Sequence, residues 1–124
     1  MIEVRYTDNL KTNLLDIEAF WDENQFPQGF DRLVDELTEP VIPNLTRHPR
    51  MGRNFLQRPP KSVETLARRQ KLDALLHTLD TSTETAEARE YVMTDYLLLY
   101  ALVGGVVYLL ALKHHKQLSF DINL

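Results

Sequence analysis

Two basic stretches hold most of the side chains that could take part in chemistry. One is Lys113-His114-His115-Lys116, near the C-terminus, and the other is the loop 47–54, with three arginines and a histidine. Histidine can transfer protons near neutral pH, and lysine and arginine can stabilise developing negative charge. These residue types suit acid–base chemistry, but the simplest interpretation of both stretches is a polar turn in contact with solvent.

Neither a metal nor a cofactor is expected. Adjacent residues of a strand point to opposite faces, so His114 and His115 would form a poor pair of ligands. His48 and His77 have no partner nearby in the sequence. The chain has no cysteine, which excludes disulfides, cysteine nucleophiles and thiolate zinc sites. A nucleotide-binding glycine loop and a Ser/His/Asp order are also absent from the sequence.

The longest apolar stretch runs from residue 96 to residue 112 without a charged side chain. It is short for a bilayer span, which needs roughly 20 apolar residues. Gly104-Gly105 lies in its middle, between runs rich in valine, tyrosine and leucine, and this pattern favours a hairpin. The stretch therefore predicts two paired strands, 96–103 and 106–112, and no contact with a membrane.

Both faces of the first of these strands are apolar. One face carries Tyr96, Leu98, Tyr100 and Leu102, and the other carries Leu97, Leu99, Ala101 and Val103. A strand with one face in water would alternate apolar and polar residues. We therefore expect helices or a partner to cover the sheet on both sides. A turn at Thr94-Asp95 predicts a further strand over 89–93, and 117–122 could add a short one.

The N-terminal half predicts one strand and two helices. Residues 2–6 alternate apolar and polar side chains, as in a half-buried strand. Apolar residues at helical spacing predict an amphipathic helix over 10–21, with Asp8 as its N-cap. A second stripe predicts a helix over 30–37, which Pro40 ends. The two helices should form an antiparallel pair on one face of the sheet.

We expect a single domain, 1–124, with a third helix inserted at about 61–86. The composition is that of a globular protein, with 44% hydrophobic and 26% charged residues. The net charge is −4, whereas a strong non-specific nucleic-acid binder is usually basic. The N-terminus shows neither a signal-peptide pattern nor a lipidation motif, so we expect a cytoplasmic protein.

In this order, the elements and motifs resemble the RelE/ParE superfamily of toxins from type II toxin–antitoxin modules. The resemblance rests on the helical pair after a short strand, on Pro49 with Gly52-Arg53, and on the tyrosine-containing hairpin that ends in His115. It covers nearly the whole chain apart from the insertion. It implies an α+β fold, with a small antiparallel sheet and a two-helix hairpin on one face, and a cognate antitoxin that neutralises the toxin.

The resemblance leaves the target and the oligomeric state open. ParE-like members inhibit growth by binding DNA gyrase and are not nucleases. RelE-like members are metal-independent endoribonucleases that cut mRNA in the ribosome. A degenerate relative would bind its antitoxin without being toxic.

If the chain is a nuclease, the resemblance assigns His115 as general acid or base. Lys113, Lys116, Arg53 and Arg47 would surround it and stabilise the charge that develops on the phosphate. Each of these roles is implied by the family and not by the residue spacing alone.

Two departures from the nuclease pattern favour a toxin that acts by binding. Nuclease members of the family carry an arginine three residues before the strand tyrosine, but here Leu97 precedes Tyr100 at that spacing. Lys116 replaces the aromatic residue that follows the histidine. We therefore expect inhibition of a macromolecular target such as DNA gyrase, with mRNA cleavage as the alternative.

Overall fold

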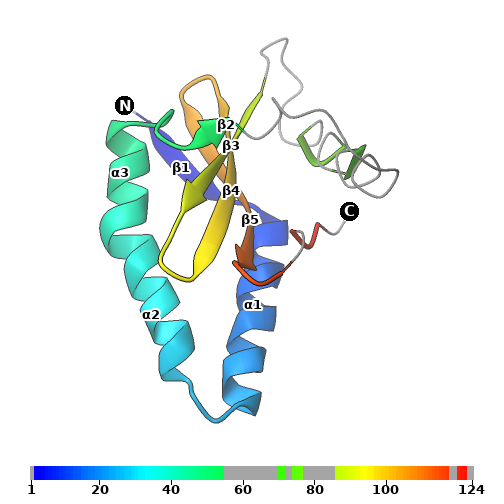
Figure 1. Cartoon of the computed structure of the whole chain (residues 1–124). Coiled ribbons are helices and arrows are strands. Elements are labelled where there is room, and N and C mark those ends of the chain that lie inside the picture. Colours follow the sequence, from blue (N-terminus) through cyan, green and yellow to red (C-terminus); the bar gives the residue numbers. More distant parts are fainter. Residues whose placement is uncertain (1, 55–69, 72–73, 77–85, 118–119, 123–124) are drawn as a thin grey trace.

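A computed structural model shows a mixed α+β fold (Figure 1). It describes residues 2–54, 70–71, 74–76, 86–117 and 120–122. The elements are β1 (Glu3–Tyr6), α1 (Asp8–Glu23), α2 (Gln28–Glu36), a π-helical segment η1 (Leu37–Val41), α3 (Ile42–Arg47), β2 (Arg53–Asn54), β3 (Glu87–Val92), β4 (Tyr96–Val103) and β5 (Val106–His114). The predicted α+β class is therefore confirmed.

The sheet is mixed, with five strands in the order β1-β5-β4-β3-β2. Strands β2 to β5 pair antiparallel with their neighbours, whereas β1 runs parallel to β5. The prediction of an antiparallel sheet is wrong at this edge. Alternation in the sequence indicates that residues 3–6 form a strand, but it carries no information on the direction of pairing.

The parallel direction follows from a continuous run of β1 and α1 along β5. Only Thr7 separates the two elements, and its hydroxyl donates to the carbonyl of Leu109 at 2.7 Å. The same oxygen accepts the backbone N–H of Leu10 at 3.2 Å and so caps α1. The predicted N-cap, Asp8, instead lies in the first turn, where its charge suits the helix dipole.

Beyond the end of β1, two asparagines of α1 form hydrogen bonds with the backbone at the edge of β5. Asn9 donates through Nδ2 to the carbonyl of Leu110 at 2.8 Å, and the N–H of Leu112 donates to Oδ1 of Asn13 at 3.0 Å. Both asparagine amides also donate to the carbonyl of Asp121, at 3.1 and 3.2 Å. Buried backbone N–H and C=O groups need hydrogen-bond partners, and here the two side chains supply the bonds that a neighbouring strand would otherwise make.

The stretch 96–112 forms the β4–β5 hairpin, as predicted. Gly104 adopts a positive φ of 58° in the connecting turn. The register shifts between Leu99 and Tyr100, which pair with Ala111 and Leu109. The extra residue, Leu110, forms a β-bulge, so Leu110 and Ala111 both pack on the second face of the sheet.

No helix within the described part of the chain is long and apolar enough to cross a membrane.

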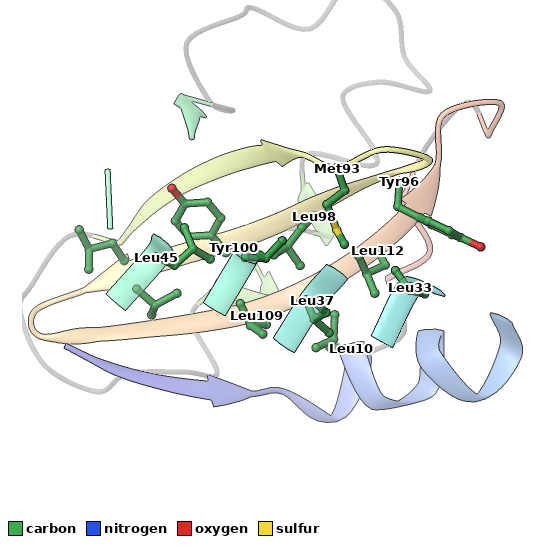
Figure 2. Packing of buried hydrophobic residues seen from close by; sticks show 13 residues of the cluster. Leu10, Leu33, Leu37, Leu45, Met93, Tyr96, Leu98, Tyr100, Leu109 and Leu112 are labelled. Carbon is green, nitrogen blue, oxygen red and sulfur yellow. The ribbon is translucent and has the colours of Figure 1, made fainter. Parts of the chain in front are cut away.

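Both faces of the sheet are covered, as the apolar strands predicted. On the first face, helical residues pack against β4 and β5 in one cluster (Figure 2). The residues of this cluster labelled in Figure 2 are Leu10, Leu33, Leu37, Leu45, Met93, Tyr96, Leu98, Tyr100, Leu109 and Leu112. On the second face, Leu75 packs with Leu99, Ala101 and Leu110, and Phe120 adjoins them.

Part of the predicted inserted helix is present. Residues 70–71 and 74–76 are helical, and the rest of the segment 61–85 lies outside the described residues. The strand suggested over 117–122 is not formed at residues 117 and 120–122, which are the described part of that segment.

Pro40 does not end the second helix, contrary to the prediction. Helix α2 passes through η1 into α3 without a break, and the N–H of Ile42 bonds to the carbonyl of Leu37, five residues back. This wider turn accommodates a proline, which lacks an N–H and would crowd a regular α-helix. Continuing the helix keeps Leu37, Val41 and Leu45 buried along one side of the core.

We expect Asn13→Ala to lower the free energy of unfolding by about 1–3 kcal/mol, because it leaves the buried N–H of Leu112 without its acceptor. Asn24→Ala is the matched control, since among the described residues this exposed amide bonds only to the carbonyl of Phe20 in α1. We expect it to change stability by less than about 0.5 kcal/mol. Denaturant unfolding measures both values. Equal losses would contradict the role of Asn13 at the edge of β5.

Candidate functional site

The loop between α3 and β2 is anchored on a buried tyrosine of β4. The hydroxyl of Tyr100 donates to the carbonyl of Pro49 at 2.8 Å and accepts the N–H of Gly52 at 3.0 Å. A Cβ on Gly52 would lie 2.7 Å from this hydroxyl and 2.5 Å from the carbonyl oxygen of Glu90. Burial raises the pKa of Tyr100, so the hydroxyl keeps its proton for the bond to the loop.

The arginines of this loop are paired with carboxylates of β3. Arg50 forms a bidentate pair with Glu87, with Nη2–Oε1 and Nε–Oε2 distances both of 3.0 Å. Arg53 lies 3.6 Å from Glu90. Arg89 donates to two carbonyls of the loop, at 2.7 and 3.1 Å. Arg50 and Arg53 are therefore neutralised at short range by carboxylates of β3, whereas Arg47 is exposed.

Three of the five residues proposed for a nuclease lie at the C-terminal end of β5. The ring Nε2 of His115 lies 3.0 Å from the carbonyl of Met93, in the turn between β3 and β4. Lys113 donates through Nζ to the carbonyl of Gln117 at 2.9 Å. Lys116 is exposed in the turn that follows β5. His115 and Lys113 thus bond to backbone carbonyls of neighbouring turns.

The other two candidates lie elsewhere. Arg53 is in β2, three strand spacings from β5, or about 14 Å at about 4.8 Å per spacing. Arg47 is exposed at the C-terminal end of α3. No hydrogen bond or ion pair joins any two of the five side chains, all of which the structure describes. The structure does not assemble them into one site, and their catalytic roles stay predictions.

Within the described ranges, no group of three or more acidic or histidine side chains could hold a metal ion.

A groove that sequence reasoning missed lies between α1 and the end of β5. This α1–β5 groove has a volume of about 560 Å³. Its apolar wall is formed by Ile17, Phe20, Trp21, Tyr96 and Leu112. Its polar lining residues are Asn13, Asp16, His114, Lys116, Gln117 and Asp121. The volume falls in the range of ligand pockets, roughly 300–1,000 Å³.

Trp21 holds the wall of this groove in place. Its indole N–H donates to the hydroxyl of Tyr96 at 3.1 Å. Its ring packs against Phe20 and Phe26, with centroid distances of 5.1 and 5.7 Å. A Cβ on Gly29 would overlap the ring, so the start of α2 can approach it only at a glycine. A second hollow of about 480 Å³ shares Trp21 and Tyr96 and continues toward α2.

The groove also presents two hydrogen-bond donors. Tyr96 accepts from Trp21, and its own hydroxyl hydrogen has no acceptor among the residues that the structure describes. Burial raises the pKa of Tyr96, which keeps this hydrogen in place. The backbone N–H of Lys116 donates to Nδ1 of His114 at 3.2 Å, so a neutral His114 carries its hydrogen on Nε2.

One residue in the sequence, Phe20, could have indicated this groove. Trp21 lies within the apolar stripe of the predicted helix 10–21, and Tyr96 lies on an apolar face of the predicted strand 96–103, so the pattern does not distinguish either residue from the core. Phe20, however, lies beside that stripe and is 54% exposed. A large aromatic residue next to a tryptophan, among acidic neighbours, is more typical of a contact surface than of a core.

Comparison of the chain with protein-family models and with curated protein sequences gives no match. Its possible functions therefore follow from its residues and their geometry.

We expect Tyr100→Phe to destabilise the fold by about 1–3 kcal/mol, because the loop loses a buried donor and a buried acceptor. Tyr108→Phe is the matched control, since within the described part of the chain its hydroxyl takes part only in an exposed bond, accepted from Arg5 at 3.3 Å. The control should lose less than about 0.5 kcal/mol. Similar losses in thermal or denaturant unfolding would show that the hydroxyl of Tyr100 does not hold the loop.

The Arg50–Glu87 pair predicts a pH-dependent contribution to stability. Hydrogen bonds from Arg50, followed by its charge, lower the pKa of Glu87 below 4.5 in the folded state. The stabilisation is therefore present above pH 4.5 and is lost as the pH falls through the lower, folded-state pKa. The stability difference between the native chain and Glu87→Gln should shrink over that range.

Glu39→Gln serves as the control, because Glu39 is exposed and forms no ion pair within the described segments. Denaturant unfolding between neutral pH and pH 3 provides the comparison. A difference for Glu87→Gln that stays constant, or grows, as the pH falls would refute the contribution of this pair.

Proposed function

We propose that the chain is the toxin of a type II toxin–antitoxin module of the RelE/ParE kind. It inhibits growth by binding a macromolecular target such as DNA gyrase, and a cognate antitoxin neutralises it. One observation carries the proposal. Pro49 and Gly52, two of the residues on which the resemblance rests, meet the hairpin tyrosine Tyr100 in one hydrogen-bonded unit. Motifs that are separate in the sequence are therefore parts of one structural element.

The arrangement of the helices gives further support. Figure 1 shows α1 and the α2–α3 run as two arms joined at residues 24–27. Both arms contribute buried leucines, among them Leu10 and Leu33, to the same face of the sheet. A helical pair on one face of a small sheet is what the resemblance implies for this family.

Binding is favoured over RNA cleavage by the electrostatics of the basic loop. A nuclease needs free cations to neutralise phosphate, whereas Arg50 and Arg53 are paired with Glu87 and Glu90. The proposed general acid or base, His115, lies beside a backbone carbonyl and far from both arginines. The chain as a whole is acidic, with a net charge of −4.

Controlled induction in a bacterial host tests the proposal, with DNA and protein synthesis followed by pulse-labelling. We expect growth to stop, DNA synthesis to fall before protein synthesis, and co-expressed antitoxin to restore growth. His115→Ala should keep its toxicity, and circular dichroism should confirm that it is folded. Lys11→Ala, an exposed change on α1 away from β5, is the control for expression level.

Two outcomes would overturn this choice of function. If protein synthesis falls first and His115→Ala is harmless to the host although folded, the chain is an endoribonuclease. If the folded chain binds an antitoxin without slowing growth, it is a non-toxic relative.

A further inference from the structure

The surface formed by the first two helices is strongly acidic. Residues 8–39 include nine acidic and two basic residues, a net charge of −7, whereas the whole chain carries −4. One of the two cations, Arg32, lies over the ring of Phe26 at 5.4 Å. A ligand that approaches these helices therefore meets a negative potential, which favours a cationic partner.

The α1–β5 groove combines this charge with an apolar wall. Asp16 and Asp121 line the groove, and Lys116 is the lysine among the lining residues. Phe20 remains 54% exposed at the groove, although its ring packs edge-on against Trp21. An exposed aromatic surface next to carboxylates suits a ligand that has both an apolar group and a positive charge.

The donors in the wall define the ligand further. Figure 2 shows the hydroxyl of Tyr96 pointing away from the hydrophobic cluster. The ring of His114 packs edge-on against Tyr96, with centroids 5.4 Å apart, and when neutral it carries its hydrogen on Nε2. Both residues line the groove, and an O–H and an N–H there can donate to the carbonyl oxygens of a polypeptide backbone.

We propose that the α1–β5 groove binds a polypeptide segment that carries an apolar side chain next to lysine or arginine. The apolar group lies against Phe20 and Trp21, and the basic group pairs with Asp16 or Asp121. This inference rests on the proposed function, because it assigns the segment to a protein partner of the toxin. Nucleic acid would be repelled by the carboxylates. A second copy would place one acidic helix against another.

The single tryptophan of the chain makes the groove directly observable. Trp21 is the only tryptophan of the chain and lines both this groove and the second hollow, so its fluorescence reports a ligand bound beside its ring, and variants of Asp16 and Phe20, which line the groove and not the second hollow, distinguish the two sites. The probe is a synthetic amphipathic peptide of leucine and lysine, and the control is the same peptide with glutamate in place of lysine. We expect the lysine peptide to shift the emission saturably and the glutamate peptide to leave it unchanged.

Two matched pairs of variants place the binding in the groove. Asp16→Lys should weaken binding of the lysine peptide by about five-fold or more, whereas Glu18→Lys, on the same helix but outside the groove, should weaken it less than about two-fold. Phe20→Ser should weaken binding, whereas Leu15→Ser should not, although Leu15 is 66% exposed. Circular dichroism confirms the fold of each variant.

The inference is overturned if neither peptide binds, if both bind equally, or if the two members of each pair weaken binding alike. These results do not depend on toxicity. Peptide binding without growth arrest would sustain the inference and remove the proposed function. Growth arrest without peptide binding would overturn the inference and leave the proposed function standing.

Discussion

The structure depends on the burial of β5, whose backbone must be hydrogen-bonded along both edges. Strand β4 pairs with one edge along the whole hairpin. On the other edge β1 pairs as far as Leu109, and the asparagines of α1 bond the groups that follow. Because β1 runs parallel to β5 and only Thr7 separates β1 from α1, the helix continues along the same edge of β5. This path leaves the groove open just beyond Asn13 and Leu112, where α1 leaves the sheet.

The two polar regions of the protein have different electrostatic character. At the basic loop, Arg50 and Arg53 pair with glutamates of β3, and Arg89 of β3 donates to loop carbonyls, so these charges mainly stabilise the loop against β3. Around the α1–β5 groove, no arginine among the described residues pairs with Asp16 or Asp121. Residues 8–39, which include α1 and α2, carry a net charge of −7, whereas the whole chain carries −4. A function that relies on attraction of cationic groups fits this distribution better than phosphate binding does.

Trp21 connects the helical layer to the hairpin. Its hydrogen bond to Tyr96 and its contact with Gly29 join the end of α1 and the start of α2 to the first residue of β4. The same ring is a wall of both hollows. Packing and recognition thus use one side chain, which is typical of aromatic residues with a polar tip. It also explains why an apolar stripe in the sequence could not distinguish core from surface at this position.

The sequence by itself determined the elements and their apolar faces. The hairpin at Gly104-Gly105, the strand 3–6, the helix after it and the need to cover both faces of β4 all follow from local periodicity and turn residues. Only the tertiary structure decided the direction of β1, the continuation of the helix through Pro40 and the placing of His115 far from Arg53 and Arg47. The physical reason is that hydrogen bonds at strand edges, burial of Val41 and ion pairs with β3 join residues distant in the chain, and periodicity does not record such partners.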